Sequence, residues 1–242
     1  MYNEPCTKCA ILRKRYINHV SMKVILDKYD KKKIQTLPCI HFDGRIIVIF
    51  TERDADKAVD YLMKQTVLGF DTETRPTFQK GKMHQVALLQ VSTHDTCFLF
   101  RLNEIGLTDS IIRLLEDTTI TKVGLSLQDD MRGLNQRRNF TPGTFVELQK
   151  EVKDIGIEDN SLQKIYANLF GKKISKGQQL SNWEADILSE AQQKYAATDA
   201  WACIKIHEEV ARMKRDRDFV LEKTPVPMTN EKEPQITNEN EQ

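Results

Sequence analysis

Pairs of acidic side chains along the chain have residue types that could bind a metal ion. Asp71 and Glu73 lie two residues apart in the segment LGFDTET. On a strand, positions i and i+2 project from the same face, so the two carboxylates would lie side by side. Their repulsion could be compensated by a divalent cation such as Mg²⁺ or Mn²⁺, which prefers hard oxygen ligands. The alternative is a strand end that reaches solvent, where two acids need no ligand.

Two further groups of residues are weaker evidence for a functional site when each is taken alone. Tyr195 and Asp199 are four residues apart, and on a helix this spacing places them on one face. A buried tyrosine bonded to a nearby acid would explain that pair equally well. Asp129 and Asp130 follow the apolar run VGLSL, where a strand is expected to pass into a helix. Acids in the first turn of a helix are also stabilised by the helix dipole, without any ligand.

Hydrophobic periodicity predicts an α/β domain that positions these acids. We expect strands at 45–50, 67–73, 83–92, 96–101, 122–126 and 145–148, and helices at 52–64, 110–116, 128–138, 161–170 and 189–214. Three antiparallel strands followed by alternating helices and strands indicate a mixed central sheet with helices on both faces. The second strand begins apolar and ends acidic, so Asp71 and Glu73 are expected at its end.

The two ends of the chain differ in charge from the region between them. Residues 1–33 carry nine Lys and Arg against three acids, a net charge of +6, and residues 224–242 carry one against four, a net charge of −3. We therefore expect a basic N-terminal extension over 1–44, a domain over 45–215, and a disordered acidic tail over 224–242. The whole chain has 36 basic and 35 acidic side chains, which argues against a histone-like polycation but not against a local basic groove.

The composition also bears on location. The longest unbroken apolar run is the five-residue segment 46–50, whereas a helix that crosses a bilayer needs about 20 residues. No apolar secretory segment occurs in the first twenty residues, so we expect a cytoplasmic protein without a membrane partner. The five cysteines are scattered, which is typical of reduced thiols. No feature of the sequence indicates an oligomeric state.

A zinc site is a further hypothesis. Cys6 and Cys9, with Cys39 and His41 far downstream, have the residue types of zinc ligands. A single Cys-x-x-Cys followed by a long gap is weak evidence, and free thiols in a loose extension are the alternative. Met22 could be an alternative start, because residues 1–21 show little globular pattern.

In their order along the chain, the acids resemble those of the DEDD superfamily of 3′→5′ exonucleases, which have a ribonuclease-H-like (DnaQ-like) fold. Tyr195 four residues before Asp199 matches the tyrosine subtype (DEDDy), because the histidine subtype would need His where this chain has Lys194. The segments VALLQV and SNW, with QKYAATDA after them, are similar to Werner-type exonuclease and ribonuclease D catalytic domains. The similarity covers about residues 45–213.

The resemblance implies a metal-dependent hydrolase. Asp71, Glu73, Asp130 and Asp199 would hold two divalent ions, Mg²⁺ or Mn²⁺, about 4 Å apart. One ion would acidify the attacking water, and the other would stabilise the leaving 3′ oxygen of a phosphodiester bond. Tyr195 would orient the water, because a phenol pKa of about 10 makes it a poor base. The products would be nucleoside 5′-monophosphates released from the 3′ end of DNA or RNA.

The second motif of that superfamily has two candidate positions. Relatives have a large apolar residue four positions after the acid, and Leu134 follows Asp130 by four. Asp129 would place Gly133 there, so we favour Asp130 and keep Asp129 as the alternative.

Nucleic-acid contacts are expected from side chains near the acids, where basic groups could line a channel for one strand. The candidates are Thr72, Arg75, Leu88, Arg132, Lys173 and Trp183, with Lys80, Lys82, His84, Arg137, Arg138, Lys172 and Lys176 as further basic groups. Any single basic side chain is explained equally well as solvated charge. Trp183 could instead pack under the last helix.

Two other functions fit part of the pattern. A catalytically weak nucleic-acid-binding module of the same fold would usually lack one or more acids, whereas this chain has candidates for all four and for Tyr195. An aspartyl-phosphate phosphatase built on Asp71 would need a second Asp in place of Glu73, and would leave the Tyr195–Asp199 pair unexplained. The preference for DNA or RNA stays open.

Overall fold

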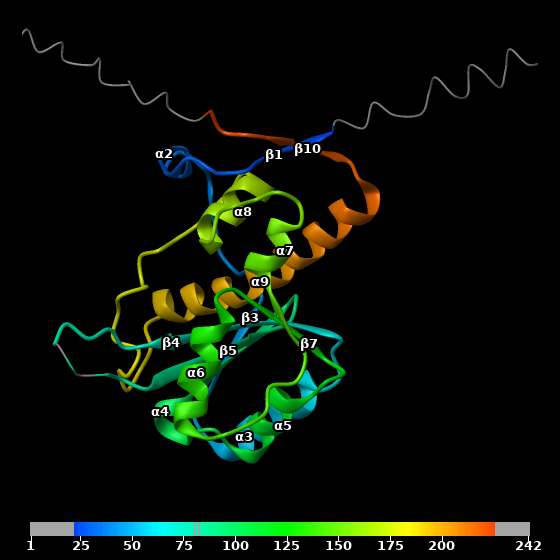
Figure 1. The fold of residues 1–242 in the computed structure, drawn as a ribbon. Helices are drawn as coiled ribbons and strands as arrows, with labels where there is room; N and C mark the ends of the chain where they lie inside the picture. The colour runs from blue at the N-terminus through cyan, green and yellow to red at the C-terminus, as the bar shows by residue number, and fades with distance from the viewer. Residues whose placement is uncertain (1–21, 80, 82, 226–242) are drawn as a thin grey trace, which may run out of the picture.

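A computed structural model describes residues 22–79, 81 and 83–225 (Figure 1). Cys6, Cys9 and nearly all of the expected acidic tail lie outside the described residues. Within the described ranges, no helix combines the length and the apolar character that crossing a membrane requires.

A six-stranded mixed sheet forms the centre of the molecule. Its strands, in spatial order, are β3 (Arg45–Ile49), β6 (Thr96–Arg101), β5 (Val86–Ser92), β4 (Val67–Thr74), β7 (Thr121–Gly124) and β8 (Phe145–Glu147). The pairs β6–β5 and β5–β4 are antiparallel, whereas β3–β6, β4–β7 and β7–β8 are parallel. The mixed sheet predicted from the sequence is therefore confirmed. β5 begins three residues later than expected: its pairing with β4 ends at Val86, opposite Thr74, the last residue of β4, after a register shift between Glu73 and Thr74.

Helices cover both faces of the sheet, as the periodicity predicted (Figure 1). They are α3 (Glu52–Leu62), α4 (Leu102–Ile105), α5 (Asp109–Glu116), α6 (Leu127–Arg137), α7 (Leu148–Lys153), α8 (Leu162–Phe170) and α9 (Glu190–Asp216). α3, α5 and α6 share one hydrophobic core with the sheet, and α9 crosses the opposite face. The start of α9 is set by a capping box in which Ser189 and Gln192 bond reciprocally. α4 and α7 are too short for a periodicity signal and were not predicted.

The N-terminal segment 22–44 packs on the domain instead of extending away from it. β1 (Lys23–Leu26) pairs in parallel with β10 (Phe219–Glu222) after α9, and β2 (Cys39–Ile40) pairs with β9 (Lys173–Ile174). Between them lies α2 (Lys31–Ile34). Ile25, Ile34 and Phe42 of this segment are buried. These strands have only two or four residues and partners far away along the chain, so local patterns do not reveal them.

Candidate active site

The face of β4 that lies under α9 carries Gly69, Asp71 and Glu73, because alternate residues of a strand share a face. A Cβ atom at Gly69 would lie 1.9 Å from the carbonyl oxygen of Ala200, so only glycine lets α9 approach β4 this closely. Ala200 is fully buried against the strand. The contact brings the preceding residue, Asp199, to the end of β4, where the two strand acids lie.

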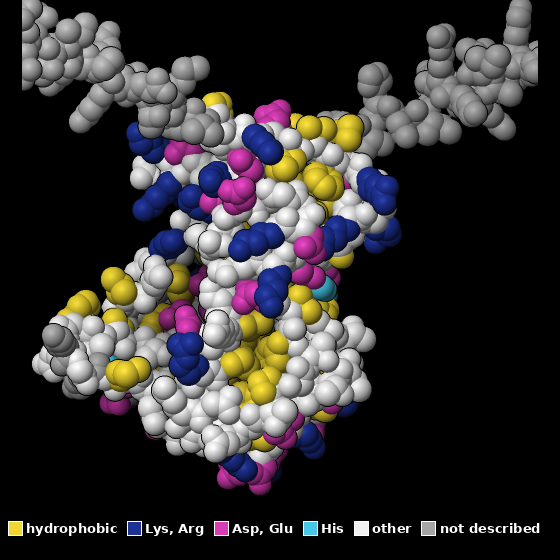
Figure 2. Space-filling model, in the orientation of Figure 1, with side chains coloured by type: hydrophobic (Ala, Val, Ile, Leu, Met, Phe, Trp, Pro, Cys, Tyr) yellow, Lys and Arg dark blue, Asp and Glu magenta, His cyan; other side chains and the backbone are white. Residues whose placement is uncertain are grey.

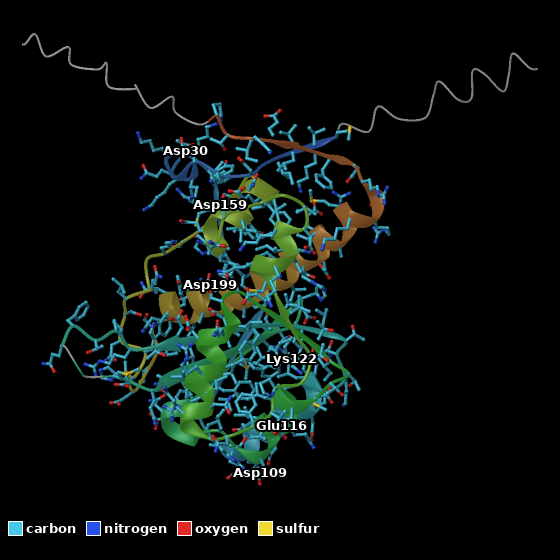
Figure 3. The ribbon with its side chains drawn as sticks, in the orientation of Figure 1. Asp30, Asp109, Glu116, Lys122, Asp159 and Asp199 are labelled. Carbon is cyan, nitrogen blue, oxygen red and sulfur yellow. The ribbon has the colours of Figure 1, made fainter. Side chains whose placement is uncertain are left out.

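Three carboxylates converge at this point. Asp71, Glu73 and Asp199 each have an oxygen atom within 4.8 Å of one from each of the others. Asp199 is buried, and the two strand acids are half-buried. Figure 3 labels Asp199 on α9, where the helix passes over the sheet. The structure thus brings together acids that are up to 128 positions apart in the sequence.

Asp130 joins the cluster from the other side of β4. Thr72 points away from α9, and its hydroxyl donates a hydrogen bond to the carboxylate of Asp130 in the first turn of α6. The same turn is fixed by Glu147 at the end of β8, which accepts hydrogen bonds from the backbone N–H groups of Ser126 (3.0 Å) and Leu127 (2.8 Å). Glu147 was not among the predicted site residues, although its place at the end of an expected strand was a signal for it.

Asp129 also lines the cavity beside these acids, but it is more exposed than Asp130. Its side chain is 80% exposed and forms an ion pair with Arg132 at 3.0 Å. Asp130 is half-buried, and burial together with the charges of Asp129 and Glu147 raises its pKa to about 7, although the bond from Thr72 works against this rise. The hydrogen bond from Thr72 and the action of the Asp130 charge on Asp71 therefore favour Asp130 over Asp129 as the fourth acid.

Burial and mutual repulsion leave the acids strongly perturbed. Burial first, and then the charges of Asp130, Glu73 and Asp199, raise the pKa of Asp71 well above its usual range. Burial and the charges of Asp199 and Asp130 raise the pKa of Glu73 to about 9. Burial raises the pKa of Asp199 to about 7, with Tyr195 opposing the rise. A divalent cation would remove this repulsion, and an all-carboxylate donor set suits Mg²⁺ or Mn²⁺.

Tyr195 and the four acids line one cavity of about 380 Å³. Burial, followed by the nearby Asp199 and Glu73 charges, raises the pKa of the Tyr195 phenol above its usual value. The phenol therefore keeps its proton at neutral pH and acts as a hydrogen-bond donor. Its ring packs near Trp183, with centroids 6.0 Å apart.

The expected nucleic-acid contacts are spread over several environments. Thr72 lines the cavity, whereas Leu88 and Trp183 are fully buried in the core beneath α9. Arg75 lies just beyond β4 and pairs with Glu184 at 3.2 Å. Arg132 is held on the surface by its pair with Asp129, and Lys173 donates to the Gln35 carbonyl at 2.6 Å, outside the acidic cavity.

The further basic side chains also lie in different environments. His84 bonds to Glu184 at 2.8 Å. Arg137 donates to the backbone carbonyl of Leu102 and Arg138 to that of Leu107, so both brace the fold. Lys176 lines the acidic cavity, Lys172 is exposed, and Lys80 and Lys82 lie outside the described residues.

Polar side chains that the sequence did not single out complete the wall of the cavity. Asn160, Ser161 and Gln163 come from the start of α8, and Gln179 comes from the loop before α9. No motif marks them, because they approach the acids only through the packing of α8 beside α9.

The chain is similar in sequence to known 3′-5′ exonucleases. The bifunctional 3′-5′ exonuclease/ATP-dependent helicase WRN of Mus musculus is 29% identical over 187 residues, which cover 73% of this chain and 13% of that protein. A 3′-5′ exonuclease of Arabidopsis thaliana is 29% identical over 190 residues, which cover 70% of this chain and 65% of that protein. The chain thus spans less than two thirds of the length of these relatives.

Solved structures share the fold. The exonuclease domain of Aedes aegypti Nibbler superposes with a TM-score of 0.65 at 19% identity, covering 72% of this chain and 91% of that one. Escherichia coli RNase D superposes with a TM-score of 0.63 at 20% identity, covering 72% of this chain and 46% of that one. These matches confirm the ribonuclease-H-like fold. Residues 46–214, more than half of the chain, match the family model described as 3′-5′ exonuclease, and the protein belongs to that family.

Proposed function

We propose that this protein is a metal-dependent 3′→5′ exonuclease of the tyrosine subtype. It hydrolyses phosphodiester bonds at the 3′ end of DNA or RNA and releases nucleoside 5′-monophosphates. The observation that carries the proposal is the convergence of Asp71, Glu73 and Asp199 within 4.8 Å, beside Asp130, in a chain of this family.

Each acid has a distinct place in the proposed metal site. Two divalent ions, Mg²⁺ or Mn²⁺, would supply Lewis acidity to the attacking water and to the leaving 3′ oxygen. The charges of the other three acids all act on Asp71, so it would hold an ion together with them. Glu73 and Asp199 approach it from β4 and α9, and Thr72 holds the Asp130 carboxylate on the α6 side.

Tyr195 orients the water in this proposal. Its raised pKa keeps the phenol protonated at neutral pH, so its hydroxyl can donate a hydrogen bond but does not serve as a base. The ring is held by Trp183, which lies under it in the core. Trp183 and Leu88 are buried in the core beneath α9. In this proposal Lys176, which lines the cavity, and Arg75, just beyond β4, contact phosphate.

The domain limits and the compartment are also proposals. We propose a catalytic domain over residues 45–215, supported by the family match over 46–214. A reducing compartment such as the cytoplasm is supported by Cys97 and Cys203, which are free thiols buried in the core.

The test is a comparison of matched single-stranded and double-stranded DNA and RNA with Mg²⁺ or Mn²⁺. A DNA polymerase I is among the relatives, and a Trypanosoma brucei RNase D has been solved with RNA, so both polymers are needed. Release of nucleoside 5′-monophosphates from at least one substrate is the expected result. Binding without hydrolysis would instead favour a catalytically inactive binding module, and hydrolysis of a general phosphatase substrate alone would favour a phosphatase.

A further inference from the structure

A second cavity adjoins the acidic one on the side of α2. It measures about 360 Å³ and is lined by Lys31, Ile34, Gln35, Cys39, Gln163, Lys173, Ile174, Ser175 and Lys176. We call it the α2 groove. Gln163, Ile174, Ser175 and Lys176 also line the acidic cavity, so the two share a wall. A chain that leaves the acidic cavity over this wall enters the α2 groove.

The charged side chains that line the α2 groove are all lysines. Lys32, Lys33 and Lys172 are exposed close to them in the sequence. Across the described part of the chain, none of these six lysines forms an ion pair. Figure 2 shows Lys and Arg side chains gathered over the α2 end of the molecule. Asp30 is close by, but its carboxylate accepts the backbone N–H of Lys32 as the cap of α2 (Figure 3).

The groove has a fixed shape because α2 is anchored on both sides. The Lys173 backbone N–H donates to the Pro38 carbonyl at 3.0 Å, and its ammonium donates to the Gln35 carbonyl at 2.6 Å. Ile34 is buried against the domain, and β2 pairs with β9 immediately after α2. These contacts hold the lysines of α2 beside Lys173 and Lys176, so this side of the molecule has a local excess of positive charge. The segment that supplies α2 lies outside the matched range 46–214.

We propose that the α2 groove binds the phosphodiester backbone of the nucleic-acid strand whose 3′ end occupies the acidic cavity. This proposal rests on the proposed exonuclease function. Lysine ammonium groups bind phosphates as point charges, and Lys176 on the shared wall leads from the metal site to Lys173 and Lys31. Ile34 and Ile174 give the groove an apolar part against which a sugar or base can pack. Segment 22–44 is thus a substrate-binding part of the protein.

The test measures binding apart from hydrolysis. Fluorescein-labelled oligo-dT and oligo-U of about 12 nucleotides are titrated with the Asp71→Asn protein in Mg²⁺, and fluorescence anisotropy gives Kd at several salt concentrations. Adding Lys31→Ala, Lys32→Ala and Lys33→Ala together should raise Kd about tenfold at low salt. It should also lower the slope of log K against log salt by about 0.7 for each of these lysines that contacts a phosphate on a single strand.

A matched triple variant controls for bulk charge. Arg53→Ala, Lys57→Ala and Lys64→Ala remove the same charge from exposed positions on and just after α3, on the opposite face of the sheet. This variant should keep Kd and the salt slope of the Asp71→Asn protein. Replacing the three α2 lysines with arginine should also preserve affinity, which separates loss of charge from loss of fold. Equal effects of the two alanine triples, or no effect of the α2 triple, would overturn the proposal.

The exposed thiol of Cys39 gives a second readout, because it lines the groove. Bound oligonucleotide should slow the alkylation of Cys39 by N-ethylmaleimide, which peptide mass spectrometry measures. An unchanged rate of alkylation would contradict binding in the α2 groove. The two proposals fail separately. If the unmodified protein hydrolyses the substrate but binding does not depend on the α2 lysines, only the proposal of the α2 groove is wrong. If binding depends on these lysines but no hydrolysis occurs, only the proposed exonuclease function is wrong.

Discussion

The hydroxyl of Thr72 donates a hydrogen bond to the carboxylate of Asp130, which links β4 to α6 at the acidic cavity. Thr72 lies between Asp71 and Glu73 on the strand but projects to the opposite face. One strand therefore presents two acids toward α9 and positions a third on α6. This contact supports our proposal that Asp130, and not Asp129, is the second-motif acid.

Asp130→Asn and Asp129→Asn form a matched pair that tests this assignment. Removing the half-buried Asp130 charge from the metal site should lower kcat at least about 100-fold, because that charge is proposed to hold an ion at the reacting groups. Asp129 also lines the cavity, but its side chain is 80% exposed and pairs with Arg132, so its replacement should change kcat less than about twofold. Initial rates with an end-labelled oligonucleotide provide the measurement. The reverse ranking would assign the site to Asp129.

Gly69→Ala should disturb both stability and activity. The new Cβ would meet the Ala200 carbonyl oxygen at 1.9 Å, which forces α9 away from β4 and separates Asp199 from Asp71. We expect a loss of about 1–3 kcal/mol in the free energy of unfolding, measured by urea denaturation, together with loss of hydrolysis. Gly177→Ala is the control, because its Cβ would make only an ordinary contact at 3.4 Å. Equal stability of the two variants would show that the close approach is not required.

The metal-free protein should lose stability as the pH rises. The folded-state pKa values of Asp130 and Asp199, about 7, and of Glu73, about 9, exceed the ordinary values of 3.8 and 4.5. The folded state therefore holds protons that the unfolded state releases, and the stability that these groups provide at low pH is lost between about pH 4 and 9. Thermal unfolding in EDTA across this range measures the effect.

Adding Mg²⁺ or Mn²⁺ should reverse that loss, and the gain in Tm should grow with pH because the ligands must be deprotonated to bind. Asp71→Asn should flatten the pH dependence of the metal-free protein. A metal-free protein whose Tm rises steadily over this pH range would contradict the proposed repulsion among the acids.

The order of the elements and the acids was predictable because both depend on local patterns. The strand with Asp71 and Glu73, and the long helix with Tyr195 and Asp199, each carry their own periodicity and were found close to their true limits. The helix N-cap at Ser126, with φ at 64°, and its brace Glu147 depend on a contact between separate elements. Local patterns contain no information about such contacts.

The position of segment 22–44 was missed for the same reason. In the sequence, Lys23–Leu26 belongs to a basic stretch. In the structure this strand is held by its pairing with Phe219–Glu222, almost two hundred residues away. Likewise Trp183 has the residue type of a base-stacking group, but it is fully buried beside Tyr195. Whether an aromatic side chain packs inside or faces a ligand is decided by tertiary packing, which one sequence does not show.

Tyr195→Phe should reduce kcat and leave substrate affinity nearly unchanged. The ring keeps its packing near Trp183, and only the hydroxyl that orients the water is lost, so we expect a decrease of about 10–100-fold. Since the raised pKa keeps the phenol protonated, the wild-type rate should show no rise near pH 10 from its ionisation. Steady-state kinetics across this range tests both points, and a Tyr195→Phe protein with full kcat would remove the residue from the mechanism.

The central claim is that the acids around Asp71 hold the ions that drive hydrolysis from a 3′ end. The most direct measurement is the product pattern of a 5′-labelled oligonucleotide with Mg²⁺ or Mn²⁺, for the unmodified protein and for Asp71→Asn. We expect a ladder that shortens one nucleotide at a time with the unmodified protein. For Asp71→Asn we expect a rate at least about 100-fold lower, with a metal-free Tm that is not reduced. An undiminished ladder from a folded Asp71→Asn protein would contradict the claim.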